Sequence, residues 1–282
     1  MAKKTIAILH PGEMGAAVGA CLVSAGHHVV WASAGRSAAT RARAKAAGLA
    51  DVATLARAVE EAEFVFSVCP PHGALDLAAE IAELGFDGLY VDGNAVSSDT
   101  AREVGARVEA AHARFVDGGI IGPAPATAGT TRFYLSGPKA GEVAALFKGT
   151  FVTATALDGP VGAASALKVC YAAWNKGSIA LLTAVRALAR HEGVDGDLMT
   201  EWKHSLPDVA KRSEAITSQA RKAWRWIGEM DEIAGSFAAA GLPGGFHIAA
   251  ADIYSRLEDF KDAAKAPTMG EILDAVATGR PD

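Results

Sequence analysis

The sequence of 282 residues has few cysteines, no excess of basic residues and no long hydrophobic run. Its cysteines, Cys21, Cys69 and Cys170, lie far apart in apolar stretches without a C-x-x-C pair, so we expect free thiols that pack as small hydrophobes in a reducing cytoplasm. A formal net charge of -5 argues against nucleic acid as a partner. No stretch reaches the roughly 18 apolar residues of a membrane helix, and no signal peptide is predicted.

Several catalytic and metal-binding motifs are also missing. The eight histidines form no H-E-x-x-H and no Cys/His cluster at metal spacing, so no metal is predicted. The chain has neither a G-x-S-x-G elbow nor a G-x-x-x-x-G-K-[ST] phosphate loop. What is present is a hydrophobic content of 50%, which is enough for a sizeable core. These features favour a small molecule as the partner.

Short β-rich runs alternate with helix-like runs through the first half of the chain, which predicts parallel strands joined by crossover helices. The alanine-rich segments between the strands, such as 16–25, 40–47 and 75–84, have the spacing of amphipathic helices. The sequence therefore predicts an α/β fold in which an N-terminal Rossmann domain holds a doubly wound, mostly parallel sheet. The expected strands are 5–9, 28–32, 64–68, 89–92, 114–117 and 132–136.

The alternation stops at Leu157-Asp158-Gly159-Pro160, and the pattern beyond it is helical with Gly or Pro breaks. We therefore expect a dinucleotide-binding domain over residues 1–157 and an all-helical domain over residues 158–282. The run 161–190 contains no proline and predicts one long helix that ends before Gly193.

A candidate cofactor loop, His10-Pro11-Gly12-Glu13-Met14-Gly15, lies between the first expected strand and the first expected helix. Gly12 would let the backbone approach a pyrophosphate, and Gly15 would let the helix pack on the strand. The helix N-terminus would supply amide donors and a partial positive charge. His10 occupies the first glycine position of G-x-G-x-x-G, where we expect a tight turn with left-handed backbone. The alternative is a plain turn.

The end of the second expected strand bears on the choice of nicotinamide cofactor. NAD enzymes place an Asp or Glu there against the ribose hydroxyls, but this chain has no acid before Asp51. Arg36, between Ser33 and Ser37, instead offers charge-assisted hydrogen bonds to a 2′-phosphate. The alternative is a solvated surface arginine. The sequence therefore favours NADP(H). Cys69 and Pro70 follow the strand expected at 64–68 and are predicted on the cofactor side of the sheet.

Lys168 is the only charged residue in the apolar run 159–171. On a helix, Tyr171, Ala172 and Asn175 would share its face. A dehydrogenase must stabilise negative charge on a carbonyl oxygen and must deliver or remove one proton, and a partly desolvated lysine does both. We therefore predict that Lys168 is the general acid/base. The alternative is a merely solvated lysine.

Taken together, these segments resemble the β-hydroxyacid dehydrogenase superfamily, which includes 3-hydroxyisobutyrate and 6-phosphogluconate dehydrogenases. The family signature G-x-x-G-x-G-x-x-x-K is similar to Gly159-x-x-Gly162-x-Ala164-x-x-x-Lys168, which implies that Lys168 is catalytic. The family's D-x-S-T loop is similar to Asp92-Gly93-Asn94-Ala95, and its D-x-P-V-S-G-G loop is similar to Asp117-Gly118-Gly119-Ile120-Ile121-Gly122-Pro123. The resemblance implies substrate contacts from Asn94, Ala95, Gly122 and Pro123, with Asn94 also near the cofactor.

The likeness is closest to NAD(P)-dependent oxidoreductases whose C-terminal domain is of unknown function, and it is carried by residues 167–174 and by Gly245-Phe246-His247. Relatives place a Lys-Asp pair on a later helix near the substrate, which resembles Met230-Asp231 here. Relatives also pair through their helical domains. The resemblance therefore implies a homodimer in which the partner's helix closes each site.

Two polar side chains of the family are absent. The asparagine one turn after the lysine is Ala172, and the serine of the second loop is Ile121. Asn175 or Lys176 is left to compensate, and we expect a more apolar pocket, with Trp224 and Trp226 close in sequence to its wall.

The expected reaction is hydride transfer between nicotinamide and a small hydroxyacid or ketoacid-like substrate, with Tyr171 and Asn175 among the substrate contacts. Two alternatives stay open. One is imine reduction or reductive amination on the same architecture, which the lost polar contacts favour and the retained lysine opposes. The other is a protein without catalysis that senses NADPH by binding it.

Overall fold

The computed structural model describes residues 2–261 and 263–278 and divides into two compact units, Met1–Val169 (unit 1) and Cys170–Asp282 (unit 2). Helix α7 (Ala163–His191) begins in unit 1 and continues into unit 2. The sequence placed the boundary before this helix, whereas the structure divides within it. The reason is that the first turn of α7 is hydrogen-bonded to strands of unit 1, from Ala164 N to Ser136 Oγ and from Ser165 N to Asp117 Oδ2.

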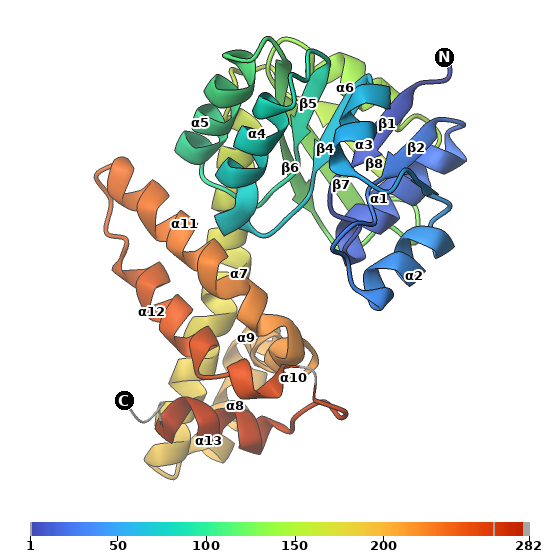
Figure 1. Cartoon of the computed structure of the whole chain (residues 1–282). Coiled ribbons are helices and arrows are strands. Elements are labelled where there is room, and N and C mark those ends of the chain that lie inside the picture. Colours follow the sequence, from blue (N-terminus) through green and yellow to red (C-terminus); the bar gives the residue numbers. More distant parts are fainter. Residues whose placement is uncertain (1, 262, 279–282) are drawn as a thin grey trace. The chain divides into compact units, whose positions relative to one another are not determined.

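The described residues of unit 1 form an eight-stranded sheet in the order β3-β2-β1-β4-β5-β6-β7-β8 (Figure 1). Strands β1 to β6 are parallel to their neighbours, β7 is antiparallel to β6, and β8 is parallel to β7. From β1 the chain builds outward through β2 and β3, then returns to place β4 on the other side of β1. This confirms the predicted doubly wound, mostly parallel sheet. The strands are β1 (Thr5–Ile8), β2 (His28–Trp31), β3 (Ala50–Asp51), β4 (Phe64–Ser67), β5 (Leu89–Asp92), β6 (Arg114–Ile121), β7 (Thr131–Ser136) and β8 (Val152–Ala156).

Helices cover both faces of this sheet. Helices α1 (Glu13–Ser24), α2 (Ala38–Ala46) and α6 (Ala140–Leu146) pack on one face. Helices α3 (Leu55–Glu61), α4 (Ala74–Glu83) and α5 (Ser98–Glu109) pack on the other, with a short 3-10 turn, η1 (Pro71–Gly73), before α4. Because both faces are covered, central strands such as β4 and β5 are buried at every position. Each fully buried Phe or Leu in them contributes roughly 1.5 to 3 kcal/mol to folding.

Strand β6 is longer than predicted. The sequence predicted a strand over 114–117 followed by a substrate loop, but the strand continues to Ile121. The cause is antiparallel pairing with β7, which runs from Asp117↔Ser136 to Ile121↔Arg132. The segment expected to be a loop is therefore strand up to Ile121, and only Gly122 and Pro123 follow it.

Unit 2 is all-helical, as predicted. Helix α7 matches the expected long helix, and Gly193 after it has a φ of 75°, the left-handed conformation that ends many helices. Arg186 and Asp195 form a two-point ion pair, with N···O distances of 2.9 and 2.8 Å, that ties α7 to the next helix. The remaining elements are α8 (Asp195–Ser205), α9 (Pro207–Ser213), α10 (Ala215–Gln219), η2 (Ala220–Trp226), α11 (Ile227–Ala239), α12 (Gly245–Ser255), η3 (Glu258–Phe260) and α13 (Met269–Thr278).

The cysteines are free thiols, as expected, but only one of them is fully packed in the interior. Cys21 is buried, Cys69 is half-buried and Cys170 is exposed. The expectation that every thiol packs in the interior is therefore wrong for Cys170, because that position faces outward on α7. None of the helices in the described part of the chain has the length and apolar content that a membrane crossing requires.

Candidate functional site

The predicted site residues of unit 1 follow the carboxyl ends of parallel strands. Strands β1, β2, β4, β5 and β6 are parallel, so the segments after them meet at one edge of the sheet. The order of the sheet reverses between β1 and β4, which is where open α/β sheets bind ligands. The predicted residues at this edge are Pro11 to Gly15 after β1, Ser33, Arg36 and Ser37 after β2, Cys69 and Pro70 after β4, Asn94 and Ala95 after β5, and Gly122 and Pro123 after β6.

The two glycines of the cofactor loop have different surroundings. A Cβ on Gly15 would lie 2.1 Å from the His10 carbonyl oxygen, so α1 approaches the end of β1 too closely for any side chain. This confirms the predicted packing role of Gly15. A Cβ on Gly12 would meet no protein atom within 4 Å. Gly12 is the N-cap residue of α1 and has no side chain to bond the first helical amides. Open space beside a helix N-terminus fits a pyrophosphate.

His10 differs from its prediction. Ala53 and His112 are the non-glycine residues with positive φ in the described part of the chain, so His10 does not adopt the left-handed backbone expected of it. The turn is made instead by a hydrogen bond from Gly12 N to His10 O of 2.8 Å. Burial, together with the nearby Arg36 guanidinium, lowers the pKa of His10 to about 4. The imidazole is therefore neutral at physiological pH, and its Nδ1 is buried without a hydrogen-bond partner in the described structure.

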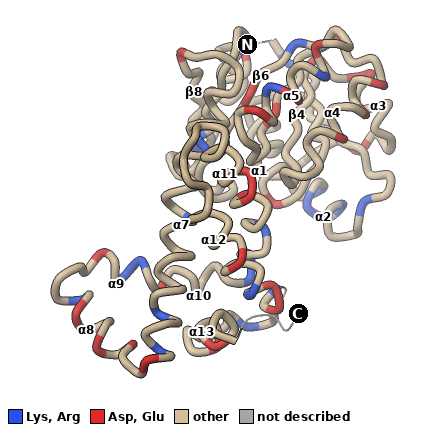
Figure 2. The backbone as a smooth tube through the Cα atoms, turned by 90° about the vertical axis from the view of Figure 1, so that its left-hand side faces the viewer, with Lys and Arg blue, Asp and Glu red and all other residues tan. Residues whose placement is uncertain are grey.

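Arginines gather around the cofactor loop and the end of β2. Only Arg36 was predicted from the sequence, but Arg41 and Arg43 from α2 join it, and Figure 2 colours the basic positions along the backbone of this helix blue. The sequence marks these two arginines only by the pattern Arg41-Ala42-Arg43. That pattern points to the site only when the fold places α2 beside the cofactor loop. Arg36 Nη2 donates to Leu9 O (3.4 Å), Arg41 Nη2 to Ser33 O (3.3 Å) and Arg43 Nε to Pro11 O (3.5 Å).

Ser33 and Ser37 have separate roles. Ser37 caps α2, since its Oγ accepts a hydrogen bond of 3.2 Å from Thr40 N. Ser33 lies beside Asp51, because β3 pairs with β2 and brings Trp31 opposite Asp51. A hydrogen bond from the Ser33 hydroxyl holds the pKa of Asp51 below its usual range. Asp51 therefore lies at the end of β2, although it belongs to the neighbouring strand. The sequence alone did not predict an acid at this place.

Asn94 faces into the protein. Its Oδ1 accepts from Cys69 N (2.6 Å), its Nδ2 donates to Ser67 Oγ (2.9 Å), and the residue is only 2% exposed. The prediction that this side chain contacts cofactor and substrate is therefore corrected, because both polar ends bind the end of β4. Asn94 instead joins the loops after β4 and β5. In this arrangement burial raises the pKa of Cys69 to about 11, so its thiol stays protonated.

Two buried polar groups lie below this loop junction. Asp92 is 1% exposed, and its Oδ1 accepts from Asn94 N at 2.7 Å. Its Oδ2 and the Tyr90 hydroxyl are both buried without a hydrogen-bond partner in the described structure. Burial raises the pKa of Asp92 to about 7. A carboxyl of this kind exchanges a proton near neutrality, and the sequence suggested no such property.

The segment after β6 presents backbone more than side chains. Gly122 has a φ of 118°, and a Cβ there would lie 2.2 Å from Thr130 O, so no other residue fits. Pro123 is exposed, and its carbonyl accepts a hydrogen bond of 2.7 Å from Thr131 Oγ1. Ile121, at the family's serine position, is 3% exposed and belongs to the core of the sheet. No polar side chain replaces that serine at this position.

Lys168 lies in unit 1, on the second turn of α7. Its Nζ donates a hydrogen bond of 2.7 Å to the carbonyl of Ile120, near the carboxyl end of β6. The side chain is half-buried. The ammonium group is therefore held at the strand edge where the cofactor loop also lies, rather than pointing away from the sheet.

The site residues predicted in unit 2 are used mostly by that unit itself. Tyr171 is 45% exposed, and Asp231 is exposed. Met230 is fully buried, so its side chain offers no surface to a substrate, and that prediction is corrected. Asn175 Oδ1 accepts a hydrogen bond of 3.0 Å from Arg212 Nη2. Lys176 pairs with Glu229, and its ammonium lies 5.1 Å from the Trp226 ring centroid. The Lys261 ammonium lies 4.1 Å from the Trp224 ring centroid, in a cation–π contact.

No group of His, Cys, Asp and Glu in residues 2–261 and 263–278 is arranged to hold a metal ion. The polar groups of unit 1 instead suit an organic anion. They are backbone amides at a helix N-terminus, guanidinium groups and one ammonium group.

Two family models match the chain. The model described as the NAD binding domain of 6-phosphogluconate dehydrogenase matches residues 5–148, and a domain of unknown function (DUF1932) matches residues 189–257. No curated protein matches the chain.

Solved structures give the same fold. A Mycobacterium tuberculosis 3-hydroxyisobutyrate dehydrogenase with L-serine is 21% identical, covers 98% of this chain and 99% of its own, and has a TM-score of 0.74. MTH1747, a conserved protein of unknown function described as structurally similar to 3-hydroxyacid dehydrogenases, is 25% identical, covers 91% and 97%, and has a TM-score of 0.69. An Aspergillus terreus reductive aminase in complex with NADPH4, cyclohexanone and allyl amine is 15% identical, covers 97% and 99%, and has a TM-score of 0.57. The chain thus has an NAD(P)-binding fold like that of the 3-hydroxyacid dehydrogenases.

Proposed function

This chain belongs to the family of the NAD binding domain of 6-phosphogluconate dehydrogenase, and we propose that it is an NADP(H)-dependent oxidoreductase acting on a small hydroxyacid or ketoacid-like substrate. The observation that carries the proposal is the place of Lys168. Its ammonium donates to Ile120 O at the strand edge that also bears the cofactor loop. Residues 1–157 hold the dinucleotide, and the helical residues 158–282 contribute to the substrate pocket and to dimerisation.

The cofactor loop supports binding of a dinucleotide. Gly12 leaves open space at the N-terminus of α1, and Glu13 and Met14 begin that helix, so backbone amides are available to the pyrophosphate. The Cys69-Pro70 segment, held by Asn94, forms the neighbouring wall. When bound, NADP(H) supplies or accepts the hydride, and the protein correspondingly supplies or accepts the proton.

Lys168 performs the proton step. In the reductive direction the substrate carbonyl carbon gains the hydride, while the Lys168 ammonium donates its proton to the carbonyl oxygen to give the alcohol. The amine then regains a proton from solvent. In the oxidative direction the same amine removes the hydroxyl proton. The backbone of Gly122 and Pro123 borders the substrate together with Ala95, while Tyr171, Asn175 and Asp231 are contacts that the family resemblance alone implies.

The preference for NADP(H) over NAD(H) rests on three guanidinium groups near the end of β2. Arg41 donates to a carbonyl that follows β2, and Arg36 and Arg43 donate to carbonyls that follow β1, at distances of 3.3 to 3.5 Å, and all three remain able to bind a phosphate. Asp51 opposes this preference, because its carboxylate lies beside Ser33. Three cations against one acid favour a 2′-phosphate.

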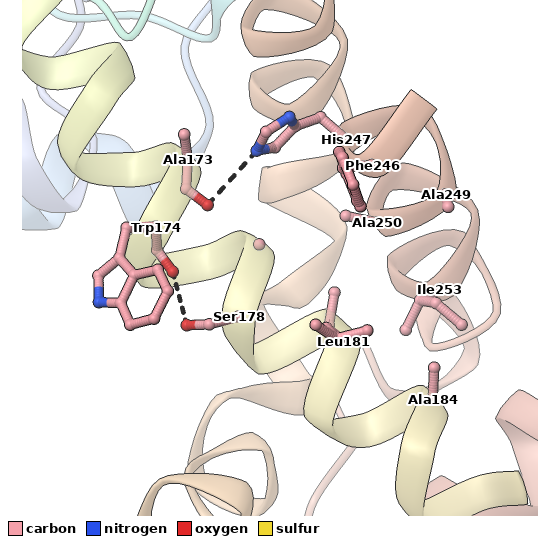
Figure 3. A pocket seen from close by; sticks show the side chains of 12 residues that line it. Ala173, Trp174, Ser178, Leu181, Ala184, Phe246, His247, Ala249, Ala250 and Ile253 are labelled. Carbon is pink, nitrogen blue, oxygen red and sulfur yellow. Dashed lines mark hydrogen bonds between the residues drawn. The ribbon is translucent and has the colours of Figure 1, made fainter. Parts of the chain in front are cut away.

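A homodimer formed through unit 2 is part of the proposal. On α7, Tyr171, Trp174, Leu181 and Leu188 follow one another at spacings of three or seven residues and are 45 to 72% exposed. Phe246 and Ile248 on α12 are 75 and 61% exposed. Between these helices lies an apolar groove of about 350 Å³, lined by Trp174, Leu181 and Ile253 (Figure 3). An apolar surface of this kind fits burial against a second copy.

The test measures NADPH oxidation against a panel of small ketoacids and a panel of cyclic imines, with wild type, Lys168→Ala and Lys139→Ala. We expect turnover of a ketoacid that Lys168→Ala lowers by at least about 100-fold, with unchanged NADPH affinity. Lys139→Ala, which removes an exposed lysine of unit 1, should leave turnover intact.

Two results would replace the proposal. Turnover confined to the imines would assign the chain to imine reduction, which the similarity to the reductive aminase makes worth including. NADPH binding without turnover of either panel would leave a binding protein that senses the cofactor.

A further inference from the structure

We propose that Asp117, with Ser136 and Ser165, is a positioning residue that sets the place of Lys168 by capping the N-terminus of α7 from the sheet. The proposal rests on the proposed function of Lys168. It adds a role for a buried carboxylate that touches neither cofactor nor substrate.

Helix α7 begins without a cap of its own. The residue before it is Gly162, which has no side chain, while the first amides of any α-helix lack partners within the helix. In most helices a Ser, Thr, Asp or Asn at this position accepts from the second or third amide. Gly162 has a φ of 97°, and a Cβ there would lie 2.7 Å from Arg102 Nη1. Arg102 can move aside, but the left-handed backbone of Gly162 and the Ser98 carbonyl oxygen at 3.2 Å disfavour a residue whose side chain would cap the helix locally.

The sheet supplies the missing cap. Asp117 Oδ2, from β6, accepts from Gly162 N and Ser165 N at 3.0 Å each. Ser136 Oγ, from β7, accepts from Ala164 N at 3.0 Å and donates to Asp117 Oδ2 at 2.8 Å. These bonds join residues 19 to 48 positions apart in the chain.

Burial makes this cap rigid. Asp117 and Ser136 are 0% exposed and Ser165 is 1% exposed. Ser165 Oγ also donates to Asp117 Oδ1 at 2.6 Å, so both carboxylate oxygens are bonded. The partial positive charge of the helix N-terminus stabilises the carboxylate, and charge-assisted bonds of this type are about twice as strong as neutral ones.

The cap lies one helical turn before Lys168. Ser165 is three residues earlier on α7, and the same turn lies against the backbone of β6. A Cβ on Gly119 would lie 2.6 Å from Ala164 O and 2.9 Å from Lys168 Cβ. The capped turn of α7 and the close backbone of β6 at Gly119 together fix the Cβ of Lys168. Its Nζ then reaches Ile120 O.

Because Asp117 lies on the same strand as Ile120, the strand that holds the cap also holds the ammonium. A loosened cap would let the first turn of α7 move and displace Nζ from the reacting oxygen. A misplacement of about 1 Å is enough to cost about 100-fold in rate. The role of Asp117 is therefore visible in kcat rather than in cofactor affinity.

The main variant is Asp117→Asn, which keeps the shape and removes the charge, and Ser165→Ala is a milder companion. We expect kcat to fall by about 10-fold for Asp117→Asn and by a smaller factor for Ser165→Ala, with NADPH affinity within about twofold of wild type. The control is Thr268→Ala, which removes the hydroxyl that accepts from Glu271 N at the start of α13. Thr268→Ala should lower the melting temperature slightly and leave kcat unchanged.

A double-mutant cycle separates positioning from general support of the fold. If Asp117 acts through Lys168, Asp117→Asn should have no further effect on the residual activity of Lys168→Ala. An equal loss in both backgrounds would overturn the proposal.

A second measurement does not depend on turnover. Lysines are acetylated with acetic anhydride, and the labelling rate of Lys168 is read by mass spectrometry relative to that of Lys139. Loss of the cap should raise the acetylation rate of Lys168 by on the order of threefold, because local opening exposes the amine. An unchanged rate would contradict the positioning role. Full activity of Lys168→Ala would instead defeat the proposed function, while the labelling rate still decides the role of Asp117.

Discussion

Unit 1 and unit 2 differ in what they leave at their surfaces. Unit 1 covers both faces of its sheet with helices, and its polar groups gather at one edge of that sheet. Unit 2 exposes most of the large apolar side chains that are exposed in the described structure, from Trp174 and Leu181 on α7 to Phe246 on α12. The polar edge of unit 1 therefore suits the binding of a ligand, whereas the apolar surface of unit 2 suits assembly.

The two units also treat buried charges differently. Unit 2 pairs each with an opposite charge, as in Lys176–Glu229 and Arg186–Asp195. In unit 1, a backbone amide donates to Asp92, and backbone amides and hydroxyl groups donate to Asp117. Carboxylates without a neutralising cation respond more strongly to pH and to substitution.

The largest expected effect concerns the pH dependence of stability. Because burial raises the pKa of Asp92 to about 7, from 3.8, the folded state keeps a proton between pH 4 and 7 that the unfolded state releases. The carboxyl therefore makes the free energy of unfolding fall as pH rises through this window, by up to about 4 kcal/mol. Asp92→Asn should remove this component.

Chemical unfolding at several pH values measures the difference between wild type and Asp92→Asn. That difference should grow in favour of the variant from pH 4 to pH 8. Asp87→Asn, at an exposed carboxyl of the same unit, is the control. A difference that stays constant with pH would show that Asp92 does not titrate in this range.

The glycine pair in the cofactor loop separates folding from binding within unit 1. Gly15→Ala should destabilise the protein by about 3 kcal/mol, because the new methyl group would lie 2.1 Å from His10 O. Gly12→Ala should leave the melting temperature unchanged and weaken NADPH binding by about 10-fold, since its methyl group enters the space left for the pyrophosphate. Thermal unfolding and fluorescence titration with NADPH measure the two effects. Equal melting temperatures for the two variants would contradict this assignment.

Leu181→Asp tests the apolar surface of unit 2. Leu181 is 61% exposed, so the charge costs the isolated chain little, but burying it against a second copy should weaken dimerisation by at least about 30-fold. Sedimentation velocity over a range of concentrations measures the change. Leu84→Asp, at a residue of unit 1 that is 40% exposed, serves as the control. A monomeric wild type would refute the homodimer directly.

The smallest expected effect concerns cofactor choice. Arg36→Ala should weaken NADPH binding by about 10-fold and leave NADH binding unchanged, because only NADPH carries the 2′-phosphate. Titration with both cofactors measures the ratio. Asp51→Asn should shift the ratio the other way by removing an acid beside Ser33. Equal losses for both cofactors after Arg36→Ala would place this arginine elsewhere on the dinucleotide.

Local patterns were enough to predict the strands and the long helix. Buried strands such as β4 and β5 appear as apolar runs, and a helix of the length of α7 needs a long stretch without proline. Local patterns did not predict β3, because two residues are too few to show the alternation of a strand. They also did not predict the end of β6, because pairing with β7 extends that strand. The orientation of Asn94 also depends on residues 25 and 27 positions away.

The amino-acid sequence by itself determined the doubly wound sheet, the glycine loop and the lysine in the apolar run 159–171, because each depends on residues near one another in the chain. Only the tertiary structure decided that Asn94 turns inward, that Asp51 reaches Ser33, that Met230 is buried and that Asp117 caps α7. Each of these depends on strands or helices that pack side by side from distant parts of the chain. Hydrogen bonds and burial act through space, so the position of a residue in the sequence does not reveal them.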